Sequence, residues 1–264
     1  MRLCLIAVSL LAGDAFFAGK PAEAKETPGK KTLCVISQVS QRFQLKKIGI
    51  MVFGNEDNTV PIENWKLDDK IYAKIRAVLA KNFNVKKIPA SYEAFQPLYE
   101  PGGLFRDTAG MMKAIVQKIS AGSACDYALL VAAGGSQFSN TNQYVGGLGV
   151  VETGSVLFGP ARQIYALTFF YVYDGKSFEM LQYGRGESDD STLFKPIHGP
   201  SQEIDAKQHP SLQAVTDDPK TREMVWRMID KSIELTLPKL LGTGEALQVA
   251  KSKTKASKDN WAPF

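Results

Sequence analysis

The apolar residues of this chain follow two spacings, one typical of β-strands and one typical of α-helices. In the first half, segments 33–39, 46–53, 84–90 and 126–133 have the apolar composition and the length of strands. Segment 126–133 is apolar at almost every position, which indicates a strand that is covered on both faces. We therefore expect this strand at the centre of a sheet.

Three segments have the spacing of helices with one apolar face. They cover residues 67–82, a stretch that starts at Thr108, and residues 218–242. Thr108 is expected to be the N-cap of the second helix, because its hydroxyl can accept a hydrogen bond from a first-turn N–H. Pro238 and Gly242 are expected to end the third helix.

The second half of the chain contains the most apolar strand, residues 163–173, whose two faces are both apolar. Asp174–Gly175 is typical of a tight turn, which leads into residues 177–183 and predicts an antiparallel hairpin at 163–183. Residues 149–158 fit either a strand or a loosely packed ribbon. The remaining long segments are predicted loops, at 92–105, 134–149 and 184–210.

This order of strands and helices predicts an α/β fold with three layers, helix–sheet–helix, around a mixed sheet. The length suits one large domain or two small ones, and we see no internal boundary. We divide the chain into a signal peptide at 1–24, a linker at 25–32, a single α/β domain at 33–242 and a disordered basic tail at 243–264.

The N-terminus has the organisation of a secretory signal peptide. Arg2 precedes an apolar run, and Ala22 and Ala24 form an A-x-A exit that predicts cleavage after Ala24. The run is too short to span a bilayer. Asp14 stands where a bacterial lipoprotein would carry its acylated cysteine, so we expect a soluble periplasmic protein without a lipid anchor.

The charge of the chain argues against a nucleic-acid partner. The formal net charge is +5, and the predicted tail supplies four lysines. The predicted domain is therefore nearly neutral and is not expected to bind nucleic acid. The tail could be attracted weakly to anionic lipid or to a cell-wall polymer. The tail lysines are Lys251, Lys253, Lys255 and Lys258.

Two cysteines, Cys34 and Cys125, remain after the predicted cleavage, and each lies at or beside a predicted strand. An oxidising compartment permits a disulfide between them. The alternative is two buried thiols that pack as small apolar side chains. The sequence leaves both possibilities open.

Motifs of catalysis, metal binding and nucleotide binding do not occur in this sequence. His198 and His209 lie in the long loop at spacings that match no metal site, so we expect no metal and no cofactor. Carboxylates such as Glu187 and Asp189 could still meet in space and act in a hydrolase. We identify no catalytic residue, and the chain is more consistent with a protein that is not an enzyme.

The loop 134–149 has two interpretations. It can be a recognition loop, because its side chains are short polar or aromatic groups that adapt to a protein or glycan surface. It can also be a plain connection whose glycines permit unusual backbone angles. The residues of the possible partner-binding loop are Gln137, Phe138, Asn140, Asn142, Gln143 and Tyr144.

Several stretches resemble the curli-secretion (CsgG-like) and penicillin-binding-protein-activator family of bacterial envelope proteins. They are CDYALLVAAGGS at 125–136, GGLG at 146–149, IYALTFFYVYDGKSFEML at 164–181 and KKIGIMVFGNEDN at 46–58. The resemblance covers about residues 46–183 as a pattern, and this chain lacks the lipid-anchor cysteine of that family. It implies an α/β envelope module that binds other proteins, and it supplies no catalytic residue.

These observations favour an exported periplasmic α/β protein, without enzymatic activity, that acts through contacts with an envelope protein or a cell-wall polymer. One alternative is a periplasmic hydrolase of polysaccharide or peptidoglycan that uses carboxylates. Another is a carrier that holds a small ligand against Tyr165, Tyr171 or Tyr173. The partner, the substrate and the oligomeric state are left open.

Overall fold

The computed structural model describes residues 29–49, 54–99, 107–139, 141–154, 160–189, 196–209 and 211–242. The predicted signal peptide and the predicted basic tail lie outside these residues. So do the cleavage site after Ala24 and residues 25–28, the first half of the predicted linker, whose last two residues belong to the first strand. None of the helices within the described ranges is both long and apolar enough to cross a membrane.

The described chain forms twelve strands, five α-helices and two short 3-10 turns. The strands are β1 Lys31–Gln38, β2 Arg42–Ile48, β3 Glu56–Pro61, β4 Phe83–Lys87, β5 Tyr127–Ala133, β6 Gly135–Gln137, β7 Tyr144–Gly146, β8 Leu148–Thr153, β9 Ala161–Ala166, β10 Thr168–Asp174, β11 Met180–Arg185 and β12 Ser201–Ile204. The helical elements are η2 Glu63–Trp65, α1 Leu67–Leu79, α2 Tyr92–Tyr99, α3 Thr108–Ser120, η3 Ala206–Gln208, α4 Leu212–Asp217 and α5 Pro219–Leu241.

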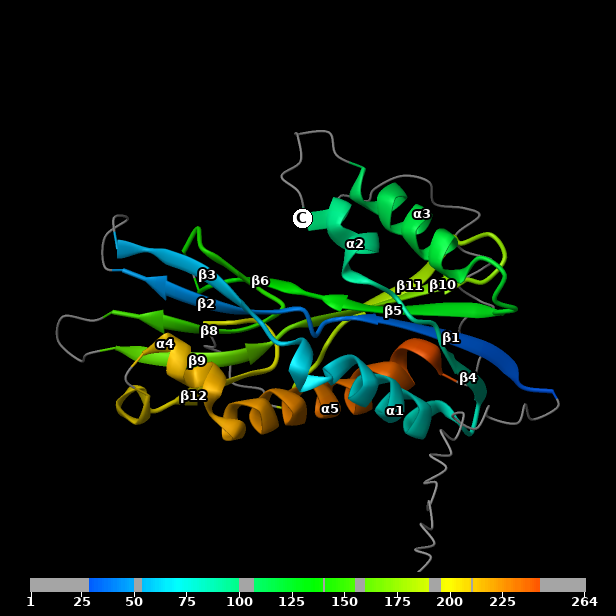
Figure 1. Ribbon diagram of the computed structural model, residues 1–264. Helices are drawn as coiled ribbons and strands as arrows, with labels where there is room; N and C mark the ends of the chain where they lie inside the picture. Colours follow the sequence, from blue (N-terminus) through cyan, green and yellow to red (C-terminus); the bar gives the residue numbers. More distant parts are fainter. Residues whose placement is uncertain are drawn as a thin grey trace, which may run out of the picture.

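The first sheet has the order β11-β10-β5-β1-β4 and forms the middle of three layers. Strands β4, β1 and β5 run parallel, whereas β10 and β11 are antiparallel to their neighbours. Helices α1 and α5 cover one face and α2 and α3 cover the other (Figure 1). The α/β fold is therefore confirmed, and β5 is the central strand, as its continuous apolar run predicted.

A second sheet, absent from the expectation of a single sheet, has the order β12-β9-β8-β2-β3. One of its faces packs on α4 and α5, and the small β6–β7 hairpin lies on the other. Helix α5 has 23 residues, which gives a length of about 35 Å. It is therefore long enough to pack against both sheets, and it joins them into one body (Figure 1).

The predicted long strand at 163–173 is divided between the two sheets at Leu167. Its first part, β9, pairs with β8 and β12 in the second sheet. Its second part, β10, pairs with β5 and β11 in the first sheet and forms the predicted antiparallel hairpin with β11. Both faces are buried or half-buried throughout 163–173, so the apolar pattern continues through the division and does not reveal it.

Strands β6, β7 and β12 lie in segments predicted as loops, and three differences from the expectation concern helices. Residues 92–99 of the predicted loop form α2, which buries Phe95 against the first sheet. Asp107, and not Thr108, is the N-cap of α3, because its carboxylate accepts the N–H of Gly110 at 2.8 Å. Pro238 lies inside α5, which continues to Leu241 and ends at Gly242 as expected.

A disulfide joins Cys34 to Cys125, with 5.7 Å between the two Cα atoms. Cys34 lies in β1, and Cys125 precedes β5 by two residues. Parallel pairing of β1 with β5 brings the beginnings of the two strands together, since Leu33 lies opposite Tyr127. The bridge is almost fully buried, so it connects the two central strands from inside the core.

We expect the double variant Cys34→Ala/Cys125→Ala to lose about 2–5 kcal/mol of unfolding free energy. The bridge spans 91 residues, and closing a loop of that length restricts the unfolded chain strongly. Urea unfolding measures this loss. Reductant should lower the urea concentration at which the original chain is half unfolded. It should leave the corresponding urea concentration of the variant unchanged. Two alkylatable thiols in the unreduced protein would contradict the bridge.

Candidate functional site

The base of the β6–β7 hairpin is hydrogen-bonded to the backbone of Leu167. The carbonyl of Leu167 accepts the N–H of Gly134 at 2.8 Å, and its own N–H donates to the carbonyl of Gly147 at 2.8 Å. Gly147 also donates to the carbonyl of Gly134 at 2.7 Å. The two ends of the hairpin are therefore held together where the two sheets meet.

Both glycines at this base fit close backbone geometry, and Gly147 is the more constrained of the two. Gly147 has φ of +61°, a left-handed conformation that side chains with a Cβ rarely adopt. A Cβ on Gly134 would lie 3.2 Å from the carbonyl carbon of Leu167. The expectation that glycines of this loop permit unusual backbone angles therefore holds at Gly147, whereas Gly134 has no positive φ and is instead limited by its close approach to Leu167.

The two long polar loops predicted from the sequence meet at this hairpin. Phe138 forms a β-bridge with Ile197, and Ser139 donates its N–H to the carbonyl of Pro196 at 2.5 Å. The N–H of His198 donates to the hydroxyl of Ser136 at 2.9 Å. Segment 196–198 thus braces one side of the hairpin, and together they form a continuous surface.

The structure places the six residues of the predicted partner-binding loop differently from one another. Gln137, Asn142 and Tyr144 are exposed, and 57% of the Tyr144 surface is accessible. Gln143 is half-buried. Phe138 is 8% exposed and packs inward with Val145, so it supports the hairpin and offers no surface to a partner. Asn140 lies outside the described residues. We call the exposed residues Gln137, Ser139, Asn142, Tyr144 and His198 the hairpin surface.

Beneath the hairpin, a polar network on the second sheet holds its position. The side-chain carbonyl of Gln44 accepts both the hydroxyl of Tyr165 and, at 3.1 Å, the N–H of Gly146. The amide nitrogen of Gln44 donates to Asp57 at 2.7 Å, and Lys46 donates to the same carboxylate at 2.8 Å. Burial raises the pKa of Tyr165 well above its usual value, and the Asp57 carboxylate raises it further. Tyr165 therefore stays a neutral donor. Sequence reasoning did not find Gln44, because nothing local distinguishes it.

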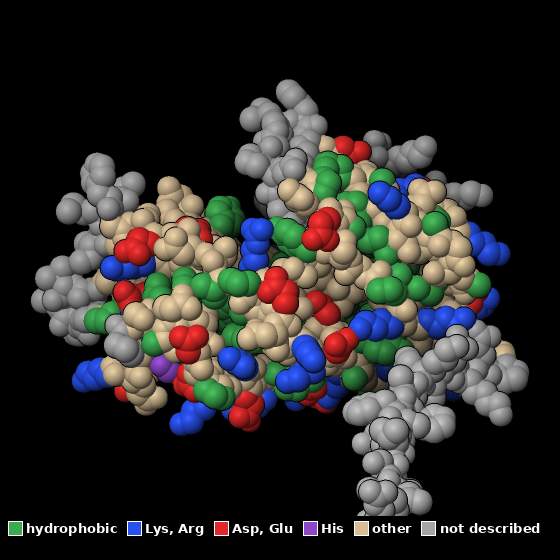
Figure 2. Space-filling view, viewed as in Figure 1, with side chains coloured by type: hydrophobic (Ala, Val, Ile, Leu, Met, Phe, Trp, Pro, Cys, Tyr) green, Lys and Arg blue, Asp and Glu red, His purple; other side chains and the backbone are tan. Residues whose placement is uncertain are grey.

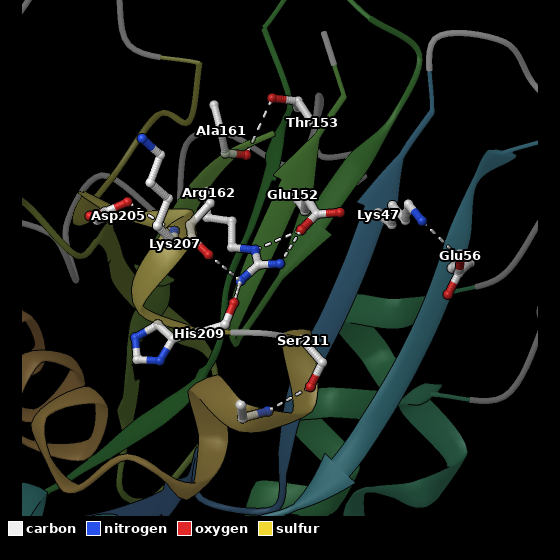
Figure 3. A network of polar contacts seen from close by, with 12 residues as sticks. Lys47, Glu56, Glu152, Thr153, Ala161, Arg162, Asp205, Lys207, His209 and Ser211 are labelled. Atoms are coloured by element: carbon white, nitrogen blue, oxygen red, sulfur yellow. Dashed lines mark hydrogen bonds and ion pairs between the residues drawn. The ribbon is translucent and has the colours of Figure 1, made fainter. Parts of the chain in front are cut away.

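A second buried network lies around Arg162 at one end of the second sheet (Figure 3). The Nε and Nη2 atoms of Arg162 donate to Glu152 at 2.6 and 2.5 Å. Its Nη1 atom donates to the carbonyls of Ala206 and His209 at 3.3 and 2.6 Å. These contacts connect β8 and β9 to the segment that enters α4. The guanidinium is engaged on all sides, so its role is structural.

The carboxylates proposed for a hydrolase are paired with lysines of α5. Glu187 forms an ion pair with Lys239, and Asp189 lies 3.8 Å from Lys231. Each carboxylate thus has its own cation, which differs from the paired arrangement that hydrolysis of a glycoside requires. Within the part of the chain that the structure describes, no three His, Cys, Asp or Glu side chains come together as metal ligands.

The three tyrosines proposed to hold a small ligand belong to the packed interior. Tyr165 is fully buried and Tyr173 is 2% exposed. Tyr171 is half-buried and stacks on Tyr183 with 6.4 Å between the ring centroids. Helices and strands therefore occupy the space around Tyr165 and Tyr173, as in ordinary core packing.

Comparison with known proteins gives low similarities. Neither a protein-family model nor a curated protein matches this chain. A solved structure from Helicobacter pylori, described as a neuraminyllactose-binding hemagglutinin homolog, has TM-score 0.35 and 11% identity, and the match covers 88% of this chain and 98% of that one. A DUF330 protein from Xanthomonas campestris has TM-score 0.29 and 8% identity, covering 87% and 94%. A lipoprotein from Neisseria meningitidis has TM-score 0.25 and 11% identity, covering 62% and 88%. We therefore infer function from the geometry of this chain.

We expect Gly147→Ala to lower the unfolding free energy by about 1–2 kcal/mol, because the left-handed conformation is unfavourable for alanine. The matched control is Gly146→Ala, whose φ is not positive and whose new Cβ would lie 3.6 Å from its nearest neighbour. That variant should change stability little. Denaturant unfolding measures both variants. Equal stability of the two would contradict the role of Gly147 at the foot of the hairpin.

We expect Arg162→Met to cost about 3–5 kcal/mol, because it leaves the carboxylate of Glu152 buried without a cation. The side chain of Glu152 is only 13% exposed. The double variant Arg162→Met/Glu152→Leu removes that charge as well and should be more stable than the single variant. Urea unfolding at neutral pH compares the two. A double variant less stable than the single one would show that the charge is not the cause.

Proposed function

We propose that this chain is an exported protein of the periplasm that acts by binding a protein of the cell envelope through the hairpin surface. This surface is ordered before the partner binds, because the hairpin is hydrogen-bonded to Leu167 and braced by segment 196–198. A surface that is ordered before binding loses less conformational entropy when the partner docks.

The observation that carries this proposal is the exposed ring of Tyr144 within a surface of polar side chains. Tyrosine is enriched at protein interfaces, since it contributes a large contact area with few rotatable bonds. Gln137, Ser139 and Asn142 supply hydrogen-bonding groups next to it. Lysine and glutamate, which are depleted at interface cores, do not belong to the hairpin surface.

The proposed compartment is supported by two independent features. The N-terminal sequence has the organisation of a signal peptide. The bridge between Cys34 and Cys125 is a type of bond that persists in the periplasm and is rare in the cytosol. The resemblance to the curli-secretion and penicillin-binding-protein-activator family forms part of the same proposal, since it implies an envelope module that binds proteins.

We expect Tyr144→Ser to weaken partner binding at least tenfold. Truncation of a central interface tyrosine typically costs about 2 kcal/mol, which is more than a tenfold change in affinity. The matched control is Tyr183→Ser, which changes the other exposed tyrosine of the described chain, 47% accessible and located on β11. A point variant is preferable to deleting the hairpin, because deletion would also remove the buried Phe138 and Val145.

The measurement uses the tagged full-length chain, expressed in Gram-negative bacterial cells that carry its partner. A photo-crosslinking residue at position 142 identifies the envelope protein that touches the hairpin, and titration of that purified protein gives the affinities. Equal affinity of the Tyr144→Ser and Tyr183→Ser variants would contradict the hairpin surface. A tagged chain that remains in the cytosol would contradict export.

A further inference from the structure

A groove of about 500 Å³ lies between α5 and the edge of the second sheet. This volume is within the range of ordinary binding pockets. One wall is formed by α5, and the other by β12 with Pro200 before it and with Ser188 and Asp189, which follow β11. The lining residues are Ser188, Asp189, Pro200, Ser201, Gln202, Met224, Arg227, Met228, Asp230 and Lys231.

The strand wall of this groove is a sheet edge. β12 is the last strand of the second sheet, and it pairs with β9 alone among the described strands. The carbonyl of Pro200 accepts the N–H of Ala166, so this opposing pair is hydrogen-bonded. Hydrogen-bonded and non-hydrogen-bonded pairs alternate in an antiparallel ladder. Ser201 and Glu203 therefore direct their N–H and C=O groups away from β9, toward the outer edge.

The helix wall presents an apolar stripe between cations. Met224 and Met228 are one turn apart on α5 and half-buried, and methionine adapts its shape to different apolar partners. Arg227 and Lys231 are also one turn apart and line the same groove. From Met224 to Lys231 the wall is about 10 Å long, the length of three extended residues.

The groove lining carries two anions, Asp189 and Asp230, and two cations, Arg227 and Lys231, and it is the weakly paired cations that can receive an acidic occupant. Arg227 pairs with Glu223 at 3.6 Å and Lys231 with Asp189 at 3.8 Å, and the side chains of both pairs are widely exposed. Such long, solvated ion pairs are weak and can exchange for another carboxylate. The anion Asp230, in contrast, is held by Lys74 at 3.0 Å. Figure 2 shows charges of both signs interspersed over α1 and α5. The preference of the groove for an acidic occupant therefore depends on its individual ion pairs and not on the charge of the whole face.

We infer that this groove binds an extended segment of a protein partner, which adds to the edge of β12 as a further strand. Its main chain hydrogen-bonds to the outward groups of Ser201 and Glu203. An apolar side chain of the segment lies on Met224 and Met228, and an acidic side chain next to it meets Arg227 or Lys231. The groove is a second surface, distinct from the hairpin surface, and it does not depend on the function proposed there.

The test is a selection of random displayed dodecapeptides on the immobilised, disulfide-bonded chain, with empty support as the control. We expect enriched peptides to alternate apolar and polar residues and to carry an acidic residue. Hydrogen exchange of the chain with an enriched peptide should slow in Ser201–Ile204. The Tyr144→Ser variant should bind these peptides as the original chain does, which separates this groove from the hairpin surface.

Two variants of one residue test the strand pairing directly. Glu203→Pro removes an outward N–H, and proline is tolerated at an outward position of an edge strand. We expect it to weaken peptide binding about tenfold, because one carbonyl of the peptide then lacks a donor. Glu203→Ala keeps the N–H and should bind at least as tightly as the original chain.

Charge reversal on the helix gives an independent measurement if Glu203→Pro does not fold. Arg227→Glu should weaken binding about tenfold, whereas Lys220→Glu, on the same helix but outside the groove lining, should not. The inference is overturned if no peptide is enriched over the empty support. It is also overturned if enriched peptides protect the hairpin instead of β12, or bind the Glu203→Pro and Arg227→Glu variants undiminished.

Discussion

The peptide unit of Leu167 is the point on which the rest of this architecture depends. Its carbonyl and N–H bind Gly134 and Gly147, while the chain on its two sides continues into different sheets. A buried backbone group without a partner is costly, so the strand can leave one sheet for the other only where these bonds are replaced. The two glycines replace them, and the β6–β7 hairpin follows from that arrangement.

The two proposed surfaces share one segment of the chain. Residues 196–198 brace the hairpin from one side, and residues 200–202 line the groove beside α5. The two surfaces differ in chemistry. The hairpin surface is polar and aromatic and suits a folded partner, whereas the groove combines a sheet edge, two methionines and two cations and suits an extended acidic segment. A protein with both could hold two partners or two parts of one.

Much of the secondary structure could be predicted because it depends on local spacing of apolar residues. The helix at 67–82 and the central strand at 126–133 occur close to their expected bounds as α1 and β5. The division at Leu167 could not be predicted, since apolar side chains line both faces before and after it. Helix α2 was missed because Pro97 and the surrounding aromatics resemble a loop, yet Phe95 gains enough burial to hold the helix.

The sequence by itself determined helices α1, α3 and α5 and strands β1, β4, β5, β10 and β11, whereas α2, β6, β7 and β12 lie in segments that it predicts as loops. Only the tertiary structure decided that segments 134–149 and 196–198 meet and that Gln44 supports the hairpin. It also decided that Cys34 lies within bonding distance of Cys125. These contacts join residues far apart in the chain, and their formation depends on how the two sheets pack. Local patterns of apolar and polar residues carry no information about that packing, because the same pattern fits either sheet.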